Sequence, residues 1–124
     1  MFEVGVVGQF EATHHLVGDF GPASQPHSHT YRIEATVSGS RLGPDGTLFD
    51  ITVLQAALTH LTGALHGRNL NDAPGLAEPN PTAEVLARAV WSQLALAVTG
   101  HDLDSLQVRV WESAEAFAAY AGDL

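Results

Sequence analysis

Alternation of apolar and polar residues predicts three strands. Apolar side chains fall mainly on even positions in residues 2–12 and 105–112, and on odd positions in residues 31–38. Since successive side chains of a strand point to opposite faces, each segment predicts a strand with one buried face. Residues 47–49, which follow the turn-forming Gly43-Pro44-Asp45-Gly46, predict a further short strand.

Two other segments carry apolar residues at the spacing of a helix. The first follows Asp50 as its N-cap, ends at Gly67, and has the stripe Ile51, Leu54, Leu58, Leu61 and Leu65. The second starts at Asn80-Pro81, the N-cap and first-turn pair, and has the stripe Leu86, Val90, Leu94 and Val98. Residues 114–120 predict a short closing helix. This order of elements predicts an α+β fold, with both helices on one face of an antiparallel sheet.

Composition narrows the possible functions. A chain of 124 residues, 45% hydrophobic and without Cys, fits one domain over residues 1–124 that needs no disulfides. The lack of Cys excludes a thiolate zinc site and a cysteine nucleophile. A net charge of −9, with no Lys, argues against a nucleic-acid partner. No segment has the length of a membrane span and the acidic start is unlike a signal peptide, so we expect a cytoplasmic protein.

Four of the seven histidines lie between Thr13 and Thr30. If the first strand continues past Ala12, His14 lies on its apolar face. If the second strand extends backwards from Tyr31, His27 and His29 lie on its apolar face. Three imidazoles therefore point inward from two strands that we expect to be hairpin neighbours.

Three neighbouring core-facing imidazoles satisfy one another poorly unless a cation lies between them. A His-x-His pair plus a third His from the next strand supplies three nitrogen ligands and leaves the fourth tetrahedral position to water or substrate. The alternative is that each His caps a loop or bonds a carbonyl, the usual explanation for a lone histidine. For this trio we predict Zn²⁺. His15, His60 and His101 lack this pattern and are expected to be surface or capping residues.

Glu112 continues the apolar face of the last strand after Val110. A carboxylate there lies either at a solvated rim or in a pocket, where it must be hydrogen-bonded. Beside a zinc site it could accept paired N–H donors from a ligand, so Glu112 is a candidate binding residue.

Six short segments in this order resemble the 6-pyruvoyltetrahydropterin synthase / 6-carboxytetrahydropterin synthase family. They are Phe10–Leu16, His27–Tyr31, Gly46–Asp50, Leu70–Asp72, Asn80–Glu84 and Val110–Ser113. The resemblance implies the tunnelling fold, in which a four-stranded antiparallel sheet carries two helices on one side and subunits assemble, commonly as hexamers, into a barrel. It also implies zinc on His14, His27 and His29, and a pterin ring held by Glu112.

Three positions depart from the family's catalytic pattern. Ala23 stands where the synthases carry a catalytic cysteine, and His66 and Gly67 stand where they carry an Asp-His pair. General acid–base groups contribute about 10²–10⁴-fold each. We therefore expect the synthase reaction on dihydroneopterin triphosphate to be absent or very slow.

Three functions remain open. The first is a zinc-dependent pterin lyase, in which zinc-bound water or His66 replaces the missing groups; alternatively, His66 only complements a helix dipole. The second is a pterin-binding protein without catalysis. The third is a hydratase or hydrolase that acts through zinc hydroxide.

Overall fold

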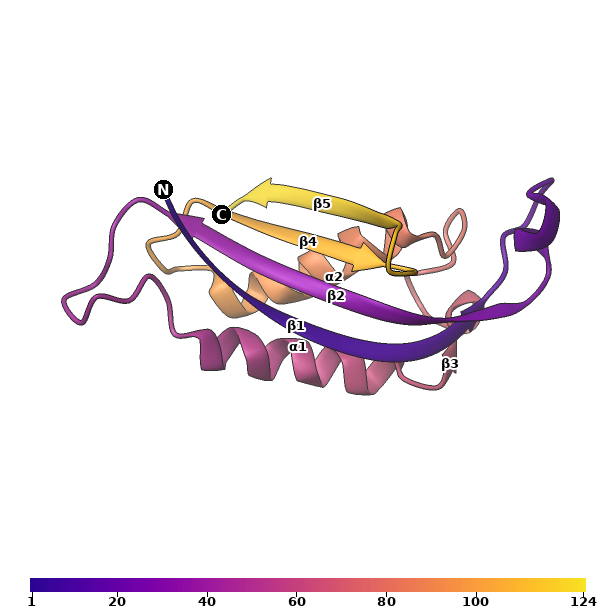
Figure 1. Cartoon of the computed structure of the whole chain (residues 1–124), viewed down its shortest axis with the longest axis horizontal. Coiled ribbons are helices and arrows are strands. Elements are labelled where there is room, and N and C mark those ends of the chain that lie inside the picture. Colours follow the sequence, from indigo (N-terminus) through magenta and orange to yellow (C-terminus); the bar gives the residue numbers. More distant parts are fainter.

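Five strands form one sheet in the computed structural model, which describes residues 1–124 (Figure 1). The strand order is β3-β1-β2-β4-β5. The antiparallel neighbours are β1 (Phe2–His14), β2 (His27–Gly39), β4 (Ser105–Trp111) and β5 (Phe117–Asp123). The two-residue β3 (Arg68–Asn69) runs parallel to β1.

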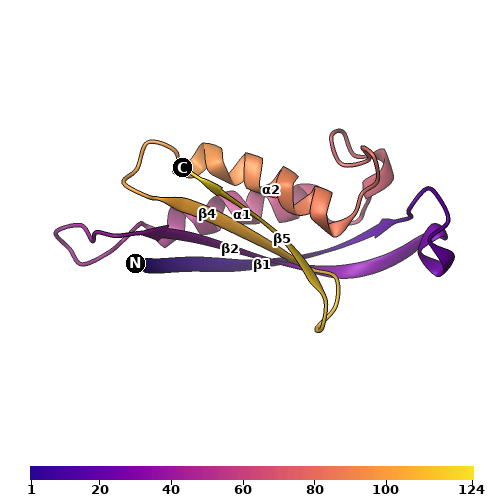
Figure 2. The same cartoon turned by 90° about the horizontal axis from the view of Figure 1, so that it is seen from above.

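β1 and β2 form a long hairpin of 13 residues per strand. Pairing runs from Phe2 and Gly39 to His14 and His27. Buried and exposed side chains alternate along most of both strands, which confirms the predicted strand parity. The closed end of the hairpin, residues 15–26, projects beyond the helices (Figures 1 and 2). It contains a short 3₁₀ turn, η1 (Gly21–Ser24).

Both helices cover the same face of the sheet, as predicted (Figure 2). α1 (Ile51–Leu65) packs on β1, and α2 (Ala83–Val98) packs on β4 and β5. Asp50 is confirmed as the N-cap of α1, since its Oδ1 accepts the N–H of Thr52 at 3.0 Å. The core between the two layers is apolar and its largest side chains are fully buried. They include Tyr31, Phe10, Ile33, Leu54, Leu58, Leu86 and Leu94.

The start of α2 differs from the prediction. Thr82 is the N-cap, because its Oγ1 accepts the N–H of Val85 at 3.1 Å, so the assignment of Asn80 to this role was wrong. The amide of Asn80 binds the backbone of Val17 instead, accepting its N–H at 2.8 Å and donating to its carbonyl at 3.2 Å.

The strand predicted for residues 47–49 is also absent. The backbone N–H of Thr47 donates to Oδ1 of Asp45 at 3.0 Å and its hydroxyl donates to the same atom at 2.8 Å. This local side-chain bonding competes with strand pairing.

The chain closes with a strand, and the helix predicted for residues 114–120 was wrong. β5 pairs with β4 from Phe117 opposite Trp111 onwards. Alanine favours helices, but tertiary packing overrides this weak preference. Gly122 lies against the Trp91 ring, where a β-carbon would come within 2.7 Å of Cζ2. Trp91 also contacts Tyr120, with ring centroids 5.4 Å apart.

The sheet has five strands and not four because β3 adds to the outer edge of β1. A two-residue strand leaves no period in the sequence. β3 leads into a second 3₁₀ turn, η2 (Leu70–Asp72).

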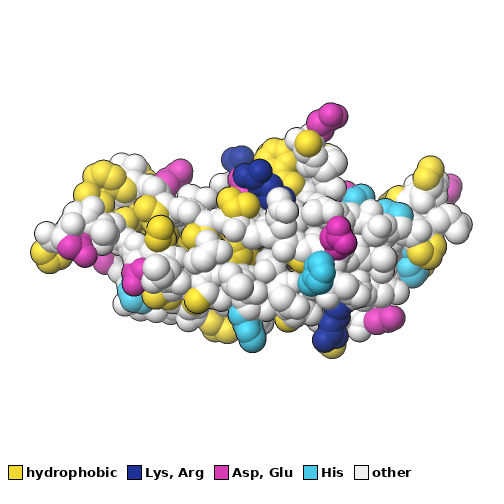
Figure 3. Space-filling model, turned by 60° about the horizontal axis from the view of Figure 1, so that its bottom comes forward, with side chains coloured by type: hydrophobic (Ala, Val, Ile, Leu, Met, Phe, Trp, Pro, Cys, Tyr) yellow, Lys and Arg dark blue, Asp and Glu magenta, His cyan; other side chains and the backbone are white.

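Hydrophobic side chains gather at the end of the molecule that carries the loop of residues 40–50 (Figure 3). Phe2, Leu42, Ile51 and Val53 are exposed large apolar residues there. Basic side chains are sparse on the same face (Figure 3). Neither helix combines the length and the hydropathy that a membrane span needs.

Candidate metal and ligand site

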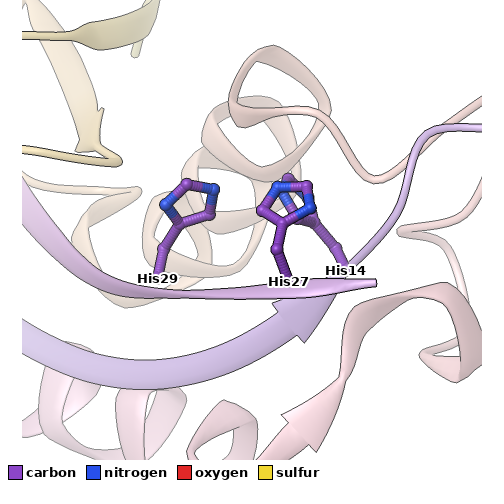
Figure 4. A group of neighbouring side chains, drawn as sticks. All are labelled: His14, His27 and His29. Carbon is purple, nitrogen blue, oxygen red and sulfur yellow. The ribbon is translucent and has the colours of Figure 1, made fainter. Parts of the chain in front are cut away.

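The hairpin register brings the three predicted histidines together. His14 ends β1 opposite His27, which begins β2, and His29 lies opposite Ala12. All three side chains project to the same side of the two strands (Figure 4). Each offers a ring nitrogen, and these atoms lie within 4.8 Å of one another.

Hydrogen bonds to backbone carbonyls determine which ring nitrogen of His14 and of His27 is free to bind a metal. Nδ1 of His14 lies 2.7 Å from the carbonyl oxygen of Pro81, and Nδ1 of His27 lies 2.7 Å from that of Gln25. A carbonyl can only accept, so each Nδ1 carries the proton and donates. The Nε2 lone pairs of His14 and His27 are thereby left free, which is the usual arrangement of a metal-binding imidazole.

Electrostatics favour neutral imidazole at the buried position. His14 is only 3% exposed, and burial lowers its pKa. The neighbouring imidazoles of His27 and His29 lower it further, whereas the Pro81 hydrogen bond and the Glu112 carboxylate act in the opposite direction. Neutral imidazole is the form that binds a metal.

The donor set fits a metal ion in number and type. Zn–N bonds of 2.0–2.1 Å in tetrahedral geometry place ligand nitrogens roughly 3.3 Å apart. Nitrogens already within 4.8 Å of one another reach that separation by small side-chain rotations. His14, His27 and His29 could therefore hold a metal ion, and three protein ligands leave the fourth tetrahedral position to another ligand.

Glu112 lies directly after β4, in the turn that leads to β5. Its backbone N–H donates to the carbonyl of Ala116 at 3.1 Å. The side chain is half-buried. Burial raises the pKa of Tyr31 and the Glu112 charge adds to this, whereas at His14 the same charge opposes the lowering of the pKa by burial. The carboxylate therefore acts electrostatically on His14. It also borders a hollow of about 500 Å³ whose other lining residues include Thr30, Arg32 and Trp111. Thr30 and Arg32 lie on the face of β2 opposite to His29 and Tyr31, so this hollow does not open onto the histidines.

His66 lies outside the cluster. It caps the C-terminus of α1, and its Nδ1 accepts the backbone N–H of Glu11 at 3.1 Å. The next residue, Gly67, has φ +75° and donates its N–H to the Glu11 carbonyl at 2.7 Å. Together these bonds fasten the end of α1 to β1.

Ala23 lies in η1, within the hairpin loop. Its carbonyl accepts the N–H of Leu16 at 2.9 Å, and its side chain is a methyl group with no proton to transfer. Of the three expected surface histidines, His60 and His101 are exposed, and His15 is half-buried.

Sequence patterns did not reveal how the hairpin loop is held. The amide of Asn71 accepts the N–H of His15 at 2.9 Å and donates to its carbonyl at 2.9 Å, as Asn80 does for Val17. Both asparagines belong to segments that the sequence had singled out, since Asn71 lies in the Leu-Asn-Asp segment and Asn80 precedes Pro81. Their sequence positions did not indicate that they bind the backbone of the hairpin loop.

The sequence model described as 6-pyruvoyl tetrahydropterin synthase matches residues 3–123. The chain belongs to the 6-pyruvoyl tetrahydropterin synthase family.

Solved structures of the same description share the fold. The 6-pyruvoyl tetrahydropterin synthase of Caenorhabditis elegans superposes with a TM-score of 0.81 at 19% identity, covering 98% of this chain and 95% of that one. That of Plasmodium falciparum gives 0.81 at 16% identity, covering 99% and 98%. That of Plasmodium vivax gives 0.78 at 14% identity, covering 100% of both chains.

Proposed function

We propose that this family member binds zinc through His14, His27 and His29 and a pterin through Glu112, and that it has lost the ordinary synthase reaction. The observation that carries the proposal is the convergence of three imidazoles within 4.8 Å. The carbonyl contacts of His14 and His27 support it, because they leave Nε2 as the free nitrogen on both rings.

Glu112 is suited to hold the pterin. The pyrimidine edge of a pterin presents adjacent N–H donors, and a carboxylate accepts two of them in a fork. Glu112 is half-buried and close enough to His14 for its charge to affect that pKa. The ring held at Glu112 would then extend its side chain towards the histidines, where bound zinc would act as a Lewis acid on the side-chain oxygens.

Proton transfer is the missing part of the chemistry. The methyl group of Ala23 cannot act as acid or base, and Gly67 has no side chain. His66 is the one titratable group at these three positions, and its Nδ1 already accepts the Glu11 N–H. We therefore favour pterin binding with slow or altered turnover over the synthase reaction.

Assembly into a homo-oligomer, with a hexamer as the expected form, is part of the proposal. β5 has one unpaired edge, and β1 has an outer edge that β3 covers only at Ala12 and Thr13. Open strand edges are ready to pair with a second copy. Such pairing would bring further side chains to the site.

The test is to load the purified protein with one equivalent of zinc and add dihydroneopterin triphosphate. Substrate loss and product mass are followed by chromatography, and bound metal by elemental analysis. We expect one zinc per chain and retained pterin, with conversion at least about 10²-fold below that of an active synthase. Rapid formation of a 6-pyruvoyl or 6-carboxy product would contradict the loss of synthase chemistry.

Two variants separate the two halves of the site. His29→Ala should release zinc, whereas Glu112→Ala should keep zinc and lose the pterin. His60→Ala, an exposed histidine on α1, is the matched control and should change neither. Zinc retained at full stoichiometry by His29→Ala would rule out the assigned metal site.

A further inference from the structure

Tyr31 lies on β2, two residues after His29 and on the same face. Its side chain is fully buried. The ring stacks on Phe10 with centroids 5.1 Å apart, and the edges of His14 and His29 approach it at 6.0 Å and 5.4 Å. Aromatic neighbours on several sides hold the ring in one place.

The hydroxyl of this tyrosine has no hydrogen-bond partner in the chain, although the atom is buried. Buried polar groups are nearly always paired, because an unpaired one costs free energy. Phenylalanine would fill the same space without that cost. The hydroxyl therefore does not stabilise the fold of the ligand-free chain through a hydrogen bond, and we look for its role in ligand binding.

Extending the register of β2 and β4 by one residue brings Glu112 opposite Tyr31. Arg32 and Trp111 are the last registered pair of β2 and β4. Tyr31 precedes Arg32 on β2, and Glu112 follows Trp111 just beyond the end of β4. Continuing the register by one residue brings the two opposite each other, on the same face of the sheet. The Glu112 charge acts on Tyr31 as well as on His14, which agrees with this placement.

We propose that Tyr31 is a positioning residue for Glu112. The two groups are not hydrogen-bonded in the ligand-free chain; when a ligand binds to the Glu112 carboxylate, the hydroxyl donates to that carboxylate and fixes its orientation. A carboxylate has about four acceptor sites, so two N–H donors of a ligand and one tyrosine O–H can be accepted together. The ligand class is a flat heterocycle with adjacent N–H groups. The inference rests on the proposed binding role of Glu112.

The test measures 7,8-dihydroneopterin binding by calorimetry in zinc-loaded Tyr31→Phe. We expect the Kd to rise about tenfold, because a hydrogen bond to a charged group is lost. Zinc content should stay the same, and the Tm should be unchanged or higher, because an unpaired buried hydroxyl has been removed. Tyr120→Phe, the same change at the other tyrosine, should alter neither Kd nor Tm.

A double-mutant cycle with Glu112→Gln tests the pairing. If Tyr31 acts through Glu112, Tyr31→Phe should weaken binding less than about twofold in the Glu112→Gln background. Parent-like affinity of Tyr31→Phe, or an equal loss in both backgrounds, would overturn the inference while leaving the role of Glu112 intact. Parent-like binding by Glu112→Ala would instead remove the proposed function on which the inference rests.

Discussion

His14 and His27 each have a backbone carbonyl that receives the Nδ1 proton. Strand parity was enough to predict that His14, His27 and His29 share one face, because a two-residue period is a local property. It could not predict Pro81 as the partner of His14, since 67 residues separate the two. The common face of the three histidines could therefore be predicted from the sequence, whereas the ring nitrogen that carries the proton in His14 and His27 could not.

Lowered pKa at His14 makes the stability of the metal-free protein depend on pH. The unfolded state regains an ordinary histidine pKa of about 6.5, so below that pH it binds a proton that folded His14 binds only at lower pH. This contribution to stability is complete above about pH 6.5 and is lost as the pH falls towards the folded pKa. Each unit of pKa difference between the folded and unfolded states corresponds to about 1.4 kcal/mol of unfolding free energy.

Thermal unfolding in the presence of a chelator, between pH 8 and pH 5, measures this effect. His14→Asn keeps an amide N–H that can donate to Pro81 but cannot titrate, so its Tm should fall less steeply towards acid pH. His60→Asn is the control at an exposed position and should follow the parent curve. Equal slopes for the parent and His14→Asn would show that His14 does not contribute.

At the level of elements, the long periodic segments were predicted correctly and the short closing segment was not. α1 and β2 have clear periods of their own. Leu54 and Leu58 of the predicted α1 stripe are buried, whereas Ile51 at its start is exposed. β5 has only seven residues and is rich in alanine, so its own composition favours a helix. This segment forms a strand because it pairs with the edge of β4 and because Gly122 lies close to the Trp91 ring. Both are tertiary contacts, which the local sequence does not reveal.

Gly122→Ala should therefore destabilise the protein. The new methyl group would meet Trp91 at 2.7 Å, and overpacking of this kind costs about 1–3 kcal/mol. Gly63→Ala is the matched control in α1, where a β-carbon has no neighbour within 4 Å, and it should stabilise by about 1 kcal/mol. Urea unfolding measures both. Equal stability of the two variants would mean that β5 does not depend on the contact.

At the level of the whole molecule, helices cover one face of the sheet, and the outer edges of the sheet are mostly unpaired. The expectation that subunits assemble into an oligomer came from the family resemblance. The spacing of apolar residues along the sequence did not indicate it. The edges arise because β1 is far longer than β3 and because β5 has no outer neighbour. A single chain therefore presents backbone N–H and C=O groups along both sides of the sheet.

Sedimentation should accordingly give a mass well above the 13.1 kDa of one chain. Val7→Lys adds a charge on β1, at a position 44% exposed, and should shift the assembly towards smaller species. Val53→Lys makes the same change on α1, at a position 41% exposed, and should not. A parent protein that sediments as a single chain would contradict edge pairing, as would equal masses for the parent and Val7→Lys.

The left-handed backbone at Gly67 limits any attempt to install the family's Asp-His pair in this chain. Grafting an Asp-His pair onto positions 66 and 67 would put a β-carbon on a residue with φ +75°, at a cost of roughly 1–2 kcal/mol. It would also remove the imidazole that accepts the Glu11 N–H and ties α1 to β1. Installing an Asp-His pair here therefore requires a redesigned connection after α1, and not only exchanged side chains.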